Sequence, residues 1–130
     1  MPPRSVTKSV SIDASYGKVF SFLVEPYNLP EWALVDITEV LAGEGGWWQV
    51  RTVAGHALLR IRSSFAFGVL DYDFDFIDAR WSIPSRLLAR QDSCEYILTL
   101  FAPSPFASDL FEHQIALADR KLAHLKMLME

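Results

Sequence analysis

Hydrophobic and polar residues alternate along much of residues 5–102, whereas after residue 108 the hydrophobic residues recur at every third or fourth position. Alternation is typical of a strand with one buried face, and the wider spacing is typical of an amphipathic helix. Residues 5–13 alternate and therefore predict a first strand. A helix follows with Asp13 or Ser15 as its N-cap, and Pro26 and Pro30 then mark a turn and a short second helix that ends near Trp32.

Short strands are expected between residues 34 and 102, separated by a glycine-rich loop at 43–46 and by turn-like pairs at 54–55, 67–68, 78–79 and 92–93. Residues 108–130 contain no glycine or proline, and one helical stripe carries Phe111, Ile115, Ala118, Leu122, Leu125 and Met129. This order predicts one α+β domain over residues 1–130. We expect a curved antiparallel sheet of about six to seven strands around a long C-terminal helix, with two short helices after the first strand.

The segment DYDFDF, residues 71–76, alternates carboxylates with aromatic rings. If each turn-like pair forms a two-residue hairpin loop, opposite charges face each other across the strands. The pairs are Arg62 with Asp73, Arg60 with Asp75, Arg86 with Asp71, and Arg90 with Glu95. A slip of one residue would bring all these charges onto the inner face, so we expect the acids on an outer, solvated face. Acids spaced along a flat strand do not converge on one point, so we predict no metal site.

The inner face is then rich in rings, and the C-terminal helix must cover it. By the same register, Ser63 faces Tyr72 and Tyr72 faces Ser85, which makes a polar patch that either orients a ligand or satisfies itself. Gln114 lies on the apolar side of the long helix and reaches either the interior or water. The rings either line a pocket or form a solid core. The complete set of candidate ligand-binding residues is Trp32, Trp48, Ile61, Ser63, Tyr72, Phe74, Phe76, Trp81, Ser85, Leu98, Phe111 and Gln114.

Composition narrows the range of partners. The net charge is −4 and no basic patch stands out, which argues against nucleic acid. Cys94 is the one cysteine, so no internal disulfide is possible, and residues 1–10 lack the apolar run of a secretory signal. We therefore expect a cytoplasmic protein, a monomer or homodimer, with no membrane span and no cofactor. None of the three histidines is expected at the centre of the inner face, which makes a nucleophilic triad improbable.

Four segments together resemble the START-like, or helix-grip (SRPBCC), superfamily, and in particular its bacterial branch similar to polyketide cyclases and dehydrases. They are VTKSVSIDASYGKVFSFLVEPYNLPEW (6–32), GEGGWWQV (43–50), FGVLDYDF (67–74) and FEHQIALADRKLAHLKMLME (111–130). The resemblance implies a deep apolar cavity between sheet and terminal helix. Members of the superfamily bind lipids, sterols, polyketides or aromatic hormones, a minority catalyse cyclisation or dehydration, and others act as co-chaperones or toxin-like regulators.

Three functional hypotheses follow from the residues and the resemblance together. The first is binding of a small hydrophobic or aromatic molecule in the interior. The second is an aromatase/cyclase or dehydratase, for which Tyr72 is the one good acid-base candidate, without an assisting His or Asp. The third is a protein-interaction module with a solid core. A fold of this kind does not by itself choose among them.

Overall fold

The computed structural model describes residues 4–33, 37–52, 55–76, 80–102 and 108–130, and the side chains of residues 108–110 are not included in the description. The elements are β1 (Ser5–Ile12), α1 (Tyr16–Val24), the 3-10 turn η1 (Pro26–Asn28), α2 (Leu29–Trp32), β2 (Ile37–Ala42), β3 (Trp48–Thr52), β4 (Gly55–Ser64), β5 (Val69–Asp75), β6 (Arg80–Ile83), β7 (Ser85–Arg90), β8 (Ser93–Phe101) and α3 (Ser108–Met129). The predicted order of strand, two short helices, strands and one long helix is confirmed.

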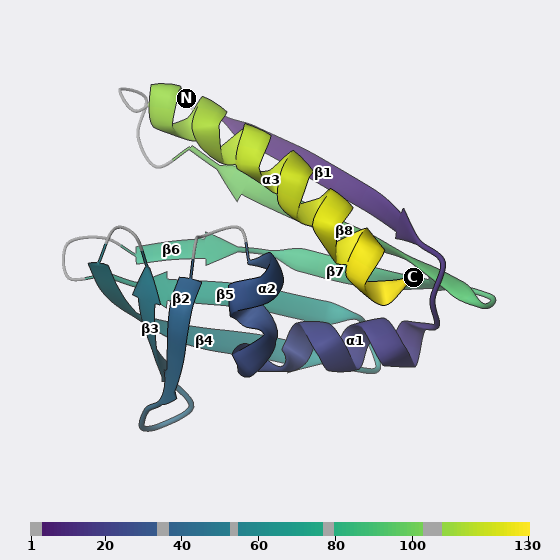
Figure 1. The fold of residues 1–130 in the computed structure, drawn as a ribbon, viewed down its shortest axis with the longest axis horizontal. Helices are drawn as coiled ribbons and strands as arrows, with labels where there is room; N and C mark the ends of the chain where they lie inside the picture. Colours follow the sequence, from purple (N-terminus) through teal and green to yellow (C-terminus); the bar gives the residue numbers. More distant parts are fainter. Residues whose placement is uncertain (1–3, 34–36, 53–54, 77–79, 103–107) are drawn as a thin grey trace.

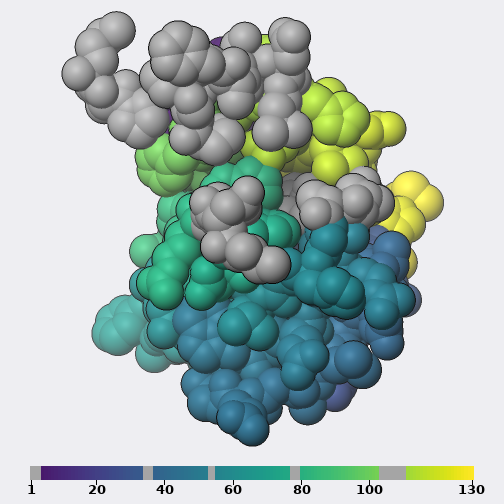
Figure 2. Space-filling view, turned by 90° about the vertical axis from the view of Figure 1, so that its left-hand side faces the viewer, coloured from purple at the N-terminus to yellow at the C-terminus, as the bar shows by residue number. Residues whose placement is uncertain are grey.

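All pairings in the sheet are antiparallel, in the order β1-β8-β7-β5-β4-β3-β2, and β6 pairs with β5 (Figure 1). The sheet curves, and α3 runs alongside β1 and also packs against α2. The other helix, α1, contacts β7 and β8. Viewed from the side, the blue β2–β3 hairpin lies at the pole opposite the yellow-green α3 (Figure 2). The α+β architecture is therefore the predicted one, and the helices share the concave face.

The sheet has eight strands where about six to seven were expected. The additional strand arises at Pro84, which divides one expected strand into β6 and β7. Proline has no N–H to give to a ladder, so a continuous central strand is interrupted there. As a result β6 pairs with β5, whereas β7 pairs mainly with β8.

Four hairpin registers differ from the prediction by two residues. Arg60 faces Asp73 and Arg62 faces Asp71, while Glu95 faces Leu88 and not Arg90. The cause is that each turn is centred one residue earlier than expected. The loop between β4 and β5, for example, contains four residues, 65–68. Because a shift of the centre by one residue moves each pairing by two, the same residues remain on each face.

The hydrophobic core lies between the concave face and the helices. Ser15 caps α1 by accepting a hydrogen bond from the Lys18 N–H, one of the two caps expected. The sequence also offers Ser108 or Asp109 as the N-cap of the long helix, and both side chains lie outside the description. The stripe on α3 is buried at Phe111, Ala118, Leu122, Leu125 and Met129. Within the described residues, no helix is both long and apolar enough to span a membrane.

Candidate functional site

Three aromatic side chains meet at the centre of the concave face. Trp32, at the end of α2, packs edge-on against Tyr72 of β5 and Tyr96 of β8, with ring-centroid distances of 5.7 Å and 5.9 Å. All three are buried, and Trp32 is only 2% exposed. Edge-to-face packing at these distances is favourable and orients each ring. The short helix α2 therefore places an indole directly over the two phenols of the sheet.

The two phenols belong to a hydrogen-bond network that ends on backbone carbonyls. Tyr72 donates to the carbonyl of Leu23 in the last turn of α1 at 2.8 Å. Tyr96 donates to Ser85 Oγ at 3.0 Å, and Ser85 Oγ donates to the Leu70 carbonyl. Each hydroxyl hydrogen in the network therefore has an acceptor within the protein.

Both phenols remain protonated at neutral pH. Burial raises the pKa of Tyr72 well above its usual value, and the neighbouring Tyr96 raises it further. Burial also raises the pKa of Tyr96, and hydrogen bonds to Ser85 and Tyr72 offset only part of that rise. A general base works best with a pKa near the working pH, so these groups are poorly suited to proton abstraction.

The indole N–H of Trp32 stands apart from this network. Among the described residues, Trp32 Nε1 is the buried side-chain nitrogen or oxygen atom that has no hydrogen-bond partner. A buried donor without a partner loses its hydration and gains nothing in return, which costs about 1–3 kcal/mol. In native proteins such groups are usually satisfied by water or a ligand. The centre of the concave face therefore presents one free donor.

The predicted polar patch is only partly correct. Ser63 is exposed and faces Leu70, whereas Tyr72 faces Ile61 and Ile83. Tyr72 and Ser85 are both buried, but the phenol that bonds to Ser85 is Tyr96, which is not among the candidate residues. The correct register places Tyr96 opposite Leu87 in β7, one pleat away from Ser85. Only the loop lengths could have revealed this arrangement.

A second aromatic cluster lies toward the β5–β6 end of the sheet. Phe76 stacks on Phe74 at 6.3 Å, and Trp81 packs edge-on against both, at 6.4 Å from Phe74 and 6.1 Å from Phe76. Phe74 is buried, while Phe76 and Trp81 are partly exposed. Phe76 also borders an open recess of about 440 Å³ lined by Gln49, His56, Ala57, Leu58 and Asp75. Another ring of the predicted set, Trp48, is half-buried and packs against Tyr27.

The remaining candidates divide between the core and the helix edge. Leu98 and Phe111 are fully buried, and Ile61 is half-buried. Phe111 is inaccessible to solvent, and the Arg4 guanidinium lies over its ring at 5.2 Å. Gln114 is half-buried on α3. Phe111 therefore anchors α3 to the sheet.

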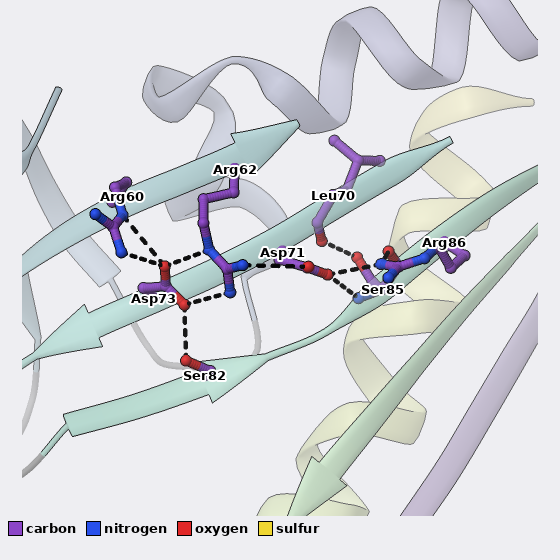
Figure 3. Close-up of polar contacts among 8 residues, drawn as sticks. All are labelled: Arg60, Arg62, Leu70, Asp71, Asp73, Ser82, Ser85 and Arg86. Atoms are coloured by element: carbon purple, nitrogen blue, oxygen red, sulfur yellow. Dashed lines mark hydrogen bonds and ion pairs between the residues drawn. The ribbon is translucent and has the colours of Figure 1, made fainter. Parts of the chain in front are cut away.

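Asp73 of the DYDFDF segment lies on the convex face, as predicted, with Arg60 and Arg62 of β4 beside it (Figure 3). It is not solvated, however, because it is only 8% exposed. Asp73 accepts hydrogen bonds from Arg60, Arg62 and Ser82, at distances of 2.7–3.3 Å. Burial would raise the pKa of Asp73, but the hydrogen bonds from Arg62, Ser82 and Arg60 prevail and lower it to about 2. The long arginine side chains shield this carboxylate from water.

Asp71 is as buried as Asp73, and it links β5 to the start of β7 (Figure 3). It accepts hydrogen bonds from the backbone N–H of Ser85 at 3.1 Å and from Arg86 Nη1 at 2.7 Å, and it forms an ion pair with Arg62 at 3.8 Å. Because Ser85 follows Pro84, Asp71 stabilises the point where β6 ends and β7 begins. The network is therefore a structural feature of the convex face.

Other reactive side chains lie away from the concave centre. Cys94 is buried, and desolvation together with the charge of Glu95 raises the pKa of its thiol. His56, His113 and His124 are exposed. Among the residues that the structure describes, no three His, Cys, Asp or Glu side chains are placed to hold a metal ion.

No family model and no curated protein matches this chain. Solved structures do match. A START superfamily protein from Mycobacterium smegmatis has 15% identity and a TM-score of 0.69, covering 95% of this chain and 98% of that one. The Aha1 dimer from Colwellia psychrerythraea has 17% identity and a TM-score of 0.75, covering 98% and 96%.

A further match is the di-domain ARO/CYC BexL from the BE-7585A biosynthetic pathway, with 15% identity and a TM-score of 0.74. That match covers 95% of this chain and 45% of BexL. At such identities the likeness shows the fold and not the activity. The chain therefore has the START-like, helix-grip fold that its sequence predicts.

Proposed function

We propose that this protein binds a small hydrophobic or aromatic molecule, such as a lipid or a polyketide, between the concave face of the sheet and α3. The observation that carries the proposal is the unpartnered N–H of Trp32 at the centre of that face. A ligand with a carbonyl or ether oxygen at this point satisfies the indole donor, while the surrounding rings contact its apolar part. The START-like fold supports the proposal as a fold of ligand-binding type.

Binding is favoured over catalysis by the chemistry of the buried groups. The titratable side chains buried on the described concave face are Tyr72, Tyr96 and Cys94, and each has a raised pKa. Their hydroxyl and thiol hydrogens therefore stay in place at neutral pH. Such groups do not remove a proton from a ligand, and their hydrogens are already donated to Leu23, Ser85 and Ala14.

Native mass spectrometry of the purified chain tests the proposal. We expect a small molecule that remains bound in the native spectrum and is absent after denaturation. Replacing Trp32 with benzothienylalanine exchanges the N–H for sulfur at nearly constant shape. This exchange should lower the affinity for that molecule about 2- to 10-fold, which corresponds to the net free energy of one hydrogen bond.

Tyr72→Phe is the matched control, because its hydroxyl is already used by the Leu23 carbonyl. We expect this variant to lose folding stability and to keep its affinity for the ligand. A bare polypeptide mass in the native spectrum, with no change in melting temperature on adding lipid or aromatic compounds, would contradict the proposal and favour a solid-core interaction module.

A further inference from the structure

A recess of about 430 Å³ lies between α2 and one flank of α3. Glu31 of α2 lines one side, and Leu117, Arg120, Lys121 and His124 of α3 line the other. Trp32 directly follows Glu31, and its ring points into the core. Two consecutive residues of the short helix α2 therefore face the two sites: Glu31 faces the recess, and Trp32 faces the concave centre.

The recess contains charged side chains that form no ion pair with the described residues, unlike those on the rest of α3. Elsewhere the helix uses its charges in ion pairs, namely Glu112 with Arg4, Asp119 with Lys8, and Lys126 with Glu130. In the described part of the chain, by contrast, Arg120, His124 and Glu31 form no ion pair and no side-chain hydrogen bond. Glu31 and Arg120 therefore line the same recess but form no salt bridge across it.

The described lining of the recess has more cationic than anionic side chains, although the protein as a whole is negatively charged. Arg120 and Lys121 lie there with Glu31 as the one described carboxylate, whereas the whole chain has a net charge of −4. A guanidinium that no described carboxylate occupies is suited to bind an oxyanion, because its N–H groups match the geometry of carboxylate and phosphate.

We propose that this recess binds the oxyanion end of an amphipathic ligand, with Arg120 as its principal contact and His124 as a second hydrogen-bonding group. The inference rests on the proposed function, since the apolar part of the same ligand extends past Leu117 toward Trp32. The preferred ligands are therefore hydrophobic acids that also carry an internal acceptor for the Trp32 N–H.

Two probes of equal chain length distinguish the contribution of the anion to binding from that of the apolar chain. Monomethyl decanedioate carries one carboxylate and one ester, whereas dimethyl decanedioate carries the same ester and no charge. Both are titrated calorimetrically into the full chain at low ionic strength, where charge contacts are least screened. We expect the monoester to bind about three- to fivefold more tightly, the upper part of the range of an exposed ion pair, and this preference to fall at high salt.

Substitutions in the recess test whether it is the source of the preference for the monoester. Arg120→Gln should abolish the preference, and Arg120→Lys should keep part of it. Arg90→Gln is the matched control, because Arg90 is also exposed, forms no ion pair with the described residues, and lies in the β7–β8 hairpin. Glu31→Gln removes a repulsive charge and should tighten binding of the monoester.

Each outcome bears on the recess and on the interior site separately. Equal binding of the two probes by the wild-type chain, or a preference that survives Arg120→Gln, overturns the oxyanion site and leaves the interior site standing. Weaker monoester binding after Glu31→Gln also overturns it, because the carboxylate of Glu31 would then be attracting the ligand. Absence of binding by both probes overturns the recess proposal, while the molecule retained in native mass spectra still decides the interior site.

Discussion

Asp73 lies beneath two arginine side chains that exclude water from it, although it belongs to the outer face of the sheet. Its carboxylate accepts hydrogen bonds from Arg60, Arg62 and Ser82. Hydrogen bonds to charged groups that are shielded from water contribute more than exposed ion pairs do. Asp73 is therefore expected to matter for folding, and not for binding a ligand.

We expect Asp73→Asn to lower the free energy of unfolding at pH 7 by about 1–3 kcal/mol. The pKa of Asp73 is about 2 in the folded chain, below the roughly 3.9 of an unfolded aspartate. Its stabilisation is therefore complete above about pH 4 and is lost as the pH falls toward 2. Urea unfolding of the wild type and the variant at several pH values measures the difference, which should shrink over that range.

The control for this prediction is Asp75→Asn, two residues further along the same strand face. Asp75 meets only the exposed Arg80 at 3.5 Å in the described chain, so its loss should cost roughly 0–1 kcal/mol. Equal losses for the two variants at pH 7 would show that the arginine cover does not shield Asp73.

At the level of elements, the sequence predicts which face each residue occupies more reliably than which residue lies opposite it. Alternation placed Tyr72, Phe74 and Ser85 on the concave face correctly, because the period of two is set by the strand itself. The pairing of Ser63 with Tyr72 failed because it depended on loop length, and four residues join β4 to β5 where two were assumed. Similarly, the pattern gave no sign that Tyr96, and not Ser63, completes the polar network.

Gly68 ends that four-residue loop in a conformation that restricts the choice of residue. Its φ is +66°, and a Cβ atom there would lie 2.1 Å from the Leu87 carbonyl oxygen. Its own carbonyl accepts a hydrogen bond from the Leu87 N–H at 2.9 Å, so the loop is attached directly to β7. A left-handed conformation alone costs a non-glycine residue about 1–2 kcal/mol. Gly68→Ala should destabilise the protein by more than about 2 kcal/mol, because the collision with the Leu87 carbonyl adds to that cost.

The matched variant is Gly45→Ala in the β2–β3 loop. Gly45 has a similar φ of +63°, and a Cβ atom there meets nothing within 4 Å. It should show only the conformational cost of about 1–2 kcal/mol. The difference between the two urea-unfolding free energies measures the collision with β7, and a difference near zero would show that the loop moves aside freely.

At the level of the whole molecule, α3 closes the concave face. Among its described side chains, the large buried ones are Phe111, Leu122, Leu125 and Met129. Burial of each contributes roughly 1.5–3 kcal/mol, or about 6–12 kcal/mol together. That amount is comparable to the entire stability of a typical domain, about 5–15 kcal/mol. The helix is therefore part of the folding unit as well as a wall of the proposed ligand site.

Removal of residues 108–130 should consequently leave a chain without fixed tertiary packing, visible as loss of the near-ultraviolet circular dichroism of its tryptophans and tyrosines. A full-length chain cut at a protease site inserted between Ala102 and Ser108 is the control, because its helix remains available to bind. We expect the cut chain to keep its spectrum, since Lys18 Nζ still donates to the Met129 carbonyl and Asp13 N to Glu130. If instead the truncated chain folds, the concave face closes without α3, and a ligand held between that face and α3 is no longer tenable.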